Sequence, residues 1–271
     1  MSEPQFPLVS ALFITWRRFD LLKPTVESFL RNTNYPNLEL VIADDGSEPA
    51  VQALIRTLPA QHFSLPPSHR GLGANNNNGL GLCTGKYIFM IQDDWLCHGP
   101  SDYLRNTVAV LEANPDVGII NFAGAPHPPD YTLPLNGSAE ACYVTPIPFQ
   151  ASTTEQFLYS DQPHIQTRAA LDSIGPYKED RDMEACEIDY NYRWGNQKLF
   201  GTAVFPAYYM RVFTNEGEAR SFRTNLLRYR VQRALLPLKP ALEGFSPVLF
   251  QRAKSIVQWT IRRIERMRLR G

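Results

Sequence analysis

The chain of 271 residues lacks the long apolar run of a membrane-spanning helix, since no run approaches about 18 residues. Residues 1–5 have neither the basic nor the apolar segment of a secretory leader, so we expect no signal peptide. The four cysteines form no CxxC pair, which favours free thiols in a reducing cytoplasm over a metal site. These absences predict a cytoplasmic protein.

The chain also lacks net charge, but the balance of zero hides an uneven distribution. Residues from 220 onward hold thirteen Lys and Arg against two acids, a net charge of +11, which leaves −11 on the residues before them. This split predicts a main domain at residues 1–219 and a basic helical tail at residues 220–271. Because the main domain is acidic, we expect no nucleic-acid partner.

Apolar strands alternate with amphipathic helices over most of the main domain. The run Ile88–Ile91 is typical of a strand that is buried on both faces. Further strands are predicted at Leu8–Ile14, Leu38–Ala43, His62–Leu65, Val117–Phe122, Gln162–Thr167 and Thr202–Phe205. The alternation predicts an α/β fold, a Rossmann-like, mainly parallel sheet with helices on both faces. Prolines punctuate residues 126–148, where we expect a long irregular stretch that shapes a substrate site.

Two of the predicted strands end in adjacent carboxylates. Asp44 and Asp45 follow one strand, and Asp93 and Asp94 follow another. Because open α/β sheets bind ligands at the carboxyl ends of their strands, we expect one site built from both pairs. Carboxylate oxygens suit a hard divalent cation, and such a cation suits a diphosphate.

Several segments in order resemble the inverting family 2 glycosyltransferases of the GT-A fold. The resemblance covers about residues 8 to 210, and we judge six weak motifs in the right order to be specific. The motifs are Phe13–Arg18 (the family's "TYNR" start), Leu40–Ser47 ("VxDDGS"), Arg70–Gly79 with Thr84–Ile88 ("GxxxARNxG…GxYI"), Gln92–Asp94 ("DxD"), Ile174–Tyr177 ("IGGFDE") and Glu187–Arg193 ("EDxDLxxR").

The resemblance implies transfer of a sugar from a nucleotide-diphosphate sugar, a UDP-sugar first, to a saccharide or lipid-linked acceptor, as in polysaccharide biosynthesis. It implies a Mn²⁺ or Mg²⁺ ion at Asp94, and it makes Asp44 the residue that reads the nucleotide base. The donor-binding residues that it implies are Thr15, Arg18, Asp44, Asp45, Arg70, Asn77 and Asp93.

An inverting transferase also needs a carboxylate that removes the proton of the acceptor hydroxyl. Glu187 matches the family best, with Glu184 and Asp189 as alternates. The chain departs from the family pattern at Gln92 and Cys186, where acids are usual, and it has no His after His164.

These departures keep an alternative open, a catalytically inactive sugar-nucleotide-binding protein docked at a membrane. A nucleotidyltransferase is a weaker alternative, because residues 15–18 contain no glycine for a phosphate loop. Residues 246–270 predict a helix with one apolar and one basic face. Such a helix suits an anionic membrane, which would place the enzyme at the inner face of the membrane, or it packs on the main domain.

Overall fold

The computed structural model describes residues 6–122, 131–134, 141–145, 159, 161–180, 182–197, 199–204 and 212–216. The chain divides into two units, Met1–Asn215 and Glu216–Gly271. The predicted basic tail, residues 220–271, lies outside the described residues. Among the helices that are described, none is both long and apolar enough to cross a membrane.

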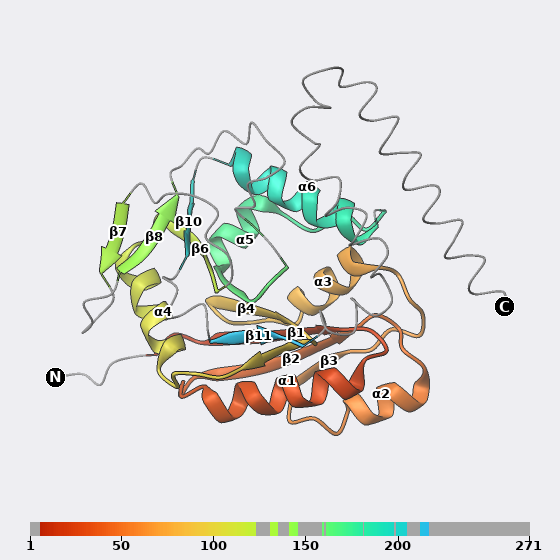
Figure 1. The fold of residues 1–271 in the computed structure, drawn as a ribbon. Helices are drawn as coiled ribbons and strands as arrows, with labels where there is room; N and C mark the ends of the chain where they lie inside the picture. Colours follow the sequence, from red (N-terminus) through yellow and green to blue (C-terminus); the bar gives the residue numbers. More distant parts are fainter. Residues whose placement is uncertain are drawn as a thin grey trace, which may run out of the picture. The chain divides into compact units, whose positions relative to one another are not determined.

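The described part of the first unit is built on a large sheet (Figure 1). Its strands are β1 (Val9–Thr15), β2 (Leu38–Asp44), β3 (His62–Ser64), β4 (Tyr87–Gln92), β6 (Val117–Asn121), β7 (Tyr131–Pro134), β8 (Ala141–Thr145), β9 (His164–Thr167) and β10 (Gly201–Val204). They pair in the order β3-β2-β1-β4-β9-β6-β10-β8-β7. A second, two-stranded sheet pairs β5 (Trp95–Cys97) with β11 (Phe213–Asn215).

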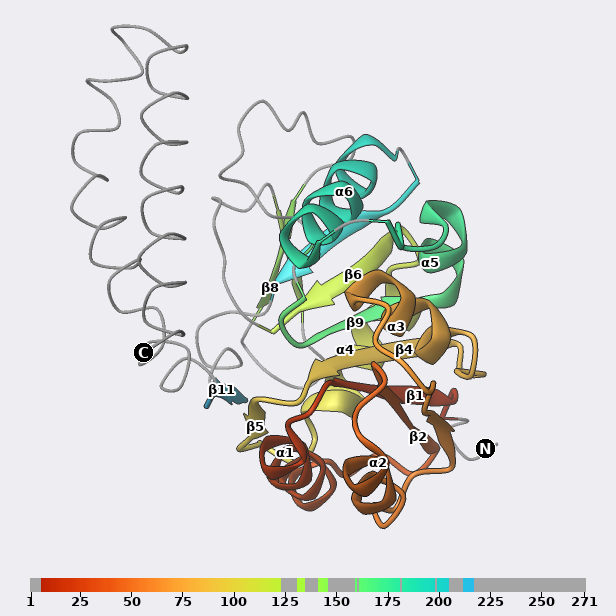
Figure 2. The same cartoon turned by 90° about the vertical axis from the view of Figure 1, so that its right-hand side faces the viewer.

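Helices cover both faces of the large sheet, as predicted (Figures 1 and 2). The helices are α1 (Phe19–Asn32), α2 (Pro49–Ile55), α3 (Leu72–Leu80), α4 (Tyr103–Ala113), α5 (Arg168–Ile174) and α6 (Met183–Asn196). Side chains of α1, α2 and α4 share one core with Phe13 and Phe89, whereas those of α3, α5 and α6 share the other with Leu12 and Met90. The alternation of side chains along β1 and β4 therefore fills two cores from the same strands.

The order of the strands creates a switch point at β1. Strands β2 and β3 lie on one side of β1 and β4 lies on the other, and all four are parallel. The carboxyl ends of β1, β2 and β4 therefore meet at one edge, which is where open α/β sheets bind ligands.

Two features of the sheet differ from the sequence prediction. Strand β9 runs antiparallel to both of its neighbours, β4 and β6. The Pro-rich stretch is not irregular throughout, because β7 and β8 form an antiparallel pair within it. Proline is tolerated at the end of an edge strand, and Pro134 is the last residue of β7.

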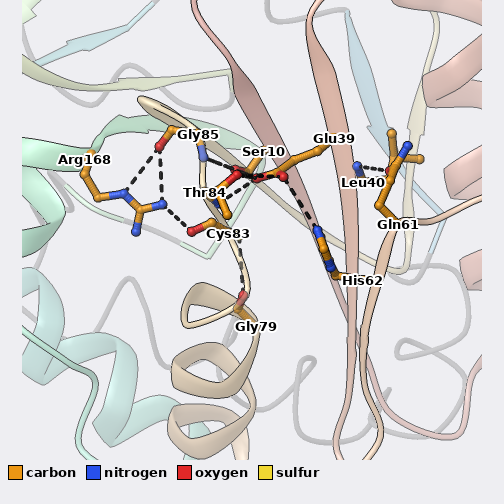
Figure 3. A network of polar contacts seen from close by, with 10 residues as sticks. All are labelled: Ser10, Glu39, Leu40, Gln61, His62, Gly79, Cys83, Thr84, Gly85 and Arg168. Atoms are coloured by element: carbon orange, nitrogen blue, oxygen red, sulfur yellow. Dashed lines mark hydrogen bonds and ion pairs between the residues drawn. The ribbon is translucent and has the colours of Figure 1, made fainter.

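A buried carboxylate joins the amino ends of β1, β2 and β4 (Figure 3). Glu39 accepts hydrogen bonds from the hydroxyl of Ser10, from the peptide N–H and hydroxyl of Thr84, and from the peptide N–H of Gly85. Although burial of Glu39 opposes ionisation, these hydrogen bonds hold the pKa of its carboxyl group below 4.5. Glu39 lies at the end of the sheet opposite the acid pairs, so we assign it to stability.

We expect Glu39→Ala to lower the free energy of unfolding by about 2–4 kcal/mol, because buried donors lose their acceptor. The pKa of Glu39 is lowered on folding, so its contribution is present above pH 4.5 and is lost as the pH falls through the folded pKa. Urea unfolding at neutral and acidic pH measures both effects. Glu27→Ala, on the exposed face of α1, is the control. Equal losses in the two variants at neutral pH would contradict the assignment.

Candidate active site

An acidic and arginine cluster lies where β1 and β4 end. Asp93 is fully buried, and its carboxylate accepts hydrogen bonds from the Thr15 hydroxyl at 2.7 Å and from the Arg18 guanidinium. The same guanidinium lies 3.3 Å from Asp94 Oδ2. Thr25 of α1 donates to the backbone carbonyl of Asp93 and fixes the strand end. The structure thus brings together four residues that the sequence predicted: Thr15, Arg18, Asp93 and Asp94.

The two acids of this cluster differ in how many of their carboxylate oxygens have a hydrogen-bond partner. Burial, together with the charge of Asp94, raises the pKa of Asp93 to about 6, while Arg18 and Thr15 oppose the rise. Asp94 Oδ1 is buried and has no hydrogen-bond partner among the described residues. A buried oxygen without a partner fits a ligand such as a divalent cation. No group of three or more His, Cys, Asp or Glu side chains within the described ranges could hold a metal ion. A cation here would therefore need oxygens of a bound diphosphate, as Mg²⁺ sites commonly do.

Asp44 and Asp45 organise the turn after β2. The carboxylate of Asp44 accepts from the N–H and hydroxyl of Ser47 and from Gln52, so it caps the turn. Gly46 has φ of +70°, and a Cβ atom there would lie 2.1 Å from the backbone of Ser68. Only glycine therefore suits this turn. The prediction that Asp44 reads a nucleotide base stays a prediction.

Asp45 holds the loop that follows β3. Its two carboxylate oxygens accept from the peptide N–H groups of Arg70 and Gly71, at 2.8 and 2.9 Å. The imidazole of His69 lies 2.7 Å from the same carboxylate. Asp45 is 4% exposed. It therefore supports the loop, and its direct contact with the donor stays a prediction.

The side chains of Arg70 and Asn77 both contact the segment that follows α5. Arg70 pairs with Glu179 at 2.5 Å. The Asn77 amide donates to Glu179 and to the carbonyl of Tyr177, and it accepts from the Tyr177 N–H. Both residues thus join the loop and α3 to residues 177–179. Direct contact of either with the donor is untested and stays a prediction.

An aromatic pair beside this loop was not singled out from the sequence. Trp16, 39% exposed, stacks on His69 with ring centroids 4.2 Å apart. Arg17 has φ of +60°, and its guanidinium lies 4.9 Å from the Trp16 ring centroid. A non-glycine residue in this conformation is strained, which is common at functional sites. The exposed part of this indole lies at the end of β1, where it can contact a nucleobase.

The candidate base lies on α6, away from this cluster in the sequence. Glu187 is half-buried, and its Oε1 accepts the peptide N–H of Asp161 at 3.1 Å. The alternate Asp189 is paired with Arg193 at 2.8 Å, which leaves it less free to accept a proton. The side chain of the other alternate, Glu184, lies outside the described residues. The helix begins where its sequence predicts, because the Asp182 side chain accepts from the N–H of Ala185.

Cys186 takes the place of a family acid, and it is buried in the core between the sheet and α6. Burial raises the pKa of its thiol to about 11, with neighbouring acids adding to the rise. The thiol is therefore neutral near pH 7 and does not replace a carboxylate as a base.

A mainly parallel sheet with helices on both faces and acids at its switch point is typical of the GT-A fold. Residues 10–160 match the family described as glycosyl transferase family 2. The chain therefore belongs to that family.

Individual relatives and structures agree with this assignment. EpsH of Bacillus subtilis is 28% identical over 121 residues, which are 43% of this chain and 34% of that protein. GalNAc(5)-diNAcBac-PP-undecaprenol beta-1,3-glucosyltransferase of Campylobacter jejuni is 26% identical over 93 residues, 32% of this chain and 30% of its own length. The chain thus spans about a third of each relative. Residues 1–349 of S. aureus TarS, solved with UDP, share the fold with a TM-score of 0.54 at 15% identity, over 74% of this chain and 58% of that one.

Proposed function

We propose that the protein is an inverting glycosyltransferase that moves a sugar from a nucleotide-diphosphate sugar to a saccharide or lipid-linked acceptor. The cluster of Thr15, Arg18, Asp93 and Asp94 at the carboxyl ends of β1 and β4 is the observation that carries this proposal. We take a UDP-sugar as the first donor to test, since a structure with a similar fold holds UDP. A lipid-linked acceptor is suggested by the undecaprenol in the name of the C. jejuni relative.

On the donor side, residues of the cluster recognise different parts of the nucleotide sugar. The exposed part of Trp16 contacts the base, and the Arg18 guanidinium supplies positive charge beside the diphosphate. Asp93 holds Arg18 and Thr15 in place. Asp94 would hold a Mn²⁺ or Mg²⁺ ion, which when bound neutralises charge on the diphosphate.

On the acceptor side, Glu187 takes the proton of the acceptor hydroxyl. The resulting oxygen attacks the anomeric carbon, and the nucleoside diphosphate leaves from the opposite face, so the configuration inverts. A carboxylate suits this step because it accepts a proton only when ionised and correctly placed. Because Oε1 of Glu187 accepts the N–H of Asp161, we assign Oε2 to the acceptor hydroxyl.

A donor screen tests the function directly. We expect binding of one of the UDP-, GDP- and dTDP-sugars in the presence of Mn²⁺, and slow hydrolysis of the donor that binds. Binding without any hydrolysis or transfer would support the alternative, an inactive sugar-nucleotide-binding protein. Absence of binding by all three classes of donor would reject both functions.

We further propose that residues 246–271 dock the enzyme on an anionic membrane. Basic residues near such a surface contribute about 1 kcal/mol each, and this part is screened by salt. Burial of the apolar face adds a part that salt does not weaken. Co-sedimentation with vesicles that contain phosphatidylserine should thus decrease but persist as salt rises, and deletion of residues 246–271 should abolish it. Unfolding of the truncated protein would instead indicate that this helix packs on the main domain.

A further inference from the structure

A second acid, which the sequence did not single out, contacts Glu187. Tyr159 and Asp161 are each held to α6 by a hydrogen bond from the backbone. The N–H of Tyr159 donates to Asn191 Oδ1 at 3.0 Å, and the N–H of Asp161 donates to Glu187 Oε1 at 3.1 Å. Glu187 and Asn191 are four residues apart, so they present both acceptors on one face of the helix.

The carboxyl group of Asp161 points to a buried tyrosine cluster. Its Oδ1 accepts from the hydroxyl of Tyr159, and the same hydroxyl contacts that of Tyr177. The Tyr177 ring stacks on Tyr190 with centroids 4.1 Å apart, and its hydroxyl lies 3.9 Å from the sulfur of Met90 on β4. The cluster thus connects Asp161 with both α6 and the strand that leads to Asp94.

We propose that Asp161 is a positioning residue for Glu187: its peptide N–H orients the Glu187 carboxylate, and its own carboxyl group, bound by the hydroxyl of Tyr159, holds that peptide in place. This inference rests on the proposed function, since it takes Glu187 as the base. The peptide N–H of Asp161 donates to Oε1 of Glu187, and this hydrogen bond fixes which carboxylate oxygen faces the acceptor. A base that is held in one orientation loses less freedom on reaching the transition state.

Electrostatics makes the second part of this role depend on pH. Burial, followed by the negative charge of Glu187, raises the pKa of Asp161 from 3.8 to about 7, although the hydrogen bond from Tyr159 opposes the rise. Among the described residues, the other ionisable side chains that interact with this pair or its tyrosines are Tyr177, Cys186, Asp189, Tyr190, Arg193 and His164.

The sign of the linkage gives a test that does not depend on activity. Because the pKa of Asp161 is raised on folding, its contribution to stability is complete below pH 3.8 and is lost as the pH rises through about 7. Asp161→Asn keeps an oxygen for Tyr159 and the N–H for Glu187, but it cannot ionise. The melting temperature of Asp161→Asn, relative to wild type, should therefore increase as the pH rises through this window. Asp172→Asn, on the exposed face of α5, is the matched control.

The same measurement in a Glu187→Gln background isolates the pair. Without the charge of Glu187, the pKa of Asp161 falls, so the dependence of the melting difference on pH should shrink. An equal dependence in both backgrounds overturns the coupling of the two carboxyl groups. If instead all four proteins share one pH dependence, Asp161 does not titrate in this window, and the proposal fails.

Activity supplies the second readout. As Asp161 ionises above pH 7, its buried charge should loosen the contact that positions Glu187, so the kcat of wild type should fall relative to that of Asp161→Asn at alkaline pH. The expected difference is up to about 100-fold, the size of effect that a small misplacement of a catalytic group can have. Below pH 6 the gap should narrow, and the KM for the donor should be unchanged at all pH values. A constant ratio of kcat values across pH overturns the role of the Asp161 carboxyl group in positioning Glu187. If Glu187→Gln stays active, the proposed base is wrong, and Asp161 then has no catalytic group to position even where the melting curves show the pair.

Discussion

Glu187→Gln is expected to lower the rate of sugar transfer by roughly 100- to 10,000-fold and to leave donor affinity unchanged. The amide cannot accept the proton of the acceptor hydroxyl, and general-base catalysis contributes a factor of this size. The substitution keeps an oxygen that can accept the N–H of Asp161, so α6 and its neighbouring segment should hold their places. Single-turnover transfer rates, measured beside the dissociation constant of the donor, separate the chemical step from binding.

Three further variants make the assignment of the base specific. Glu27→Gln, on α1 at the opposite face of the sheet, should transfer at the wild-type rate. Asp189→Asn should lose the ion pair with Arg193 but keep transfer within about tenfold, because it leaves Glu187 unchanged. Retained transfer in Glu187→Gln, with loss in Glu184→Gln or Asp189→Asn, would move the base to one of the alternates.

The sequence predicts those parts of the fold in which the local pattern of apolar residues matches their burial in the structure. The apolar runs that became β1, β2 and β4 are buried on both faces, so their composition alone indicates a central parallel strand. Strands β5 and β11 have three residues each, too few for an alternation to be recognised. The antiparallel direction of β9 depends on the path that the chain takes before this strand, and the residues of the strand itself do not indicate that path.

The candidate site likewise contains residues that the sequence predicts and residues that it does not. Asp93 and Asp94 end a buried strand, so their place could be predicted from the sequence, and their contact with Arg18 and Thr15 follows from the switch point at β1. Asp161 lies beyond the Pro-rich stretch and carries no motif. Its contact with Glu187 spans 26 residues and is made by a peptide N–H, a group that every residue except proline has. Only the folded chain identifies it.

Asp94→Asn is expected to weaken Mn²⁺-dependent binding of the donor by about 100-fold or more. Loss of an outer partner of a metal ligand typically costs about 10- to 100-fold in affinity, and removal of a direct carboxylate ligand should cost at least as much. The buried, unpartnered Oδ1 of Asp94 is the atom that motivates this expectation. Titration of Mn²⁺ against donor binding, followed by calorimetry in wild type and variant, measures the effect without relying on transfer.

Asp93→Asn provides the most closely matched comparison, because the two acids are adjacent and differ in their partners. The oxygens of Asp93 already accept from Thr15 and Arg18, so its loss should release Arg18 and weaken donor binding whether or not Mn²⁺ is present. Asp94→Asn should act mainly through the Mn²⁺-dependent part, and Asp116→Asn, an exposed carboxylate before β6, should have no effect. Equal Mn²⁺ dependence in Asp94→Asn and wild type would falsify the metal assignment and leave Arg18 as the source of positive charge for the diphosphate.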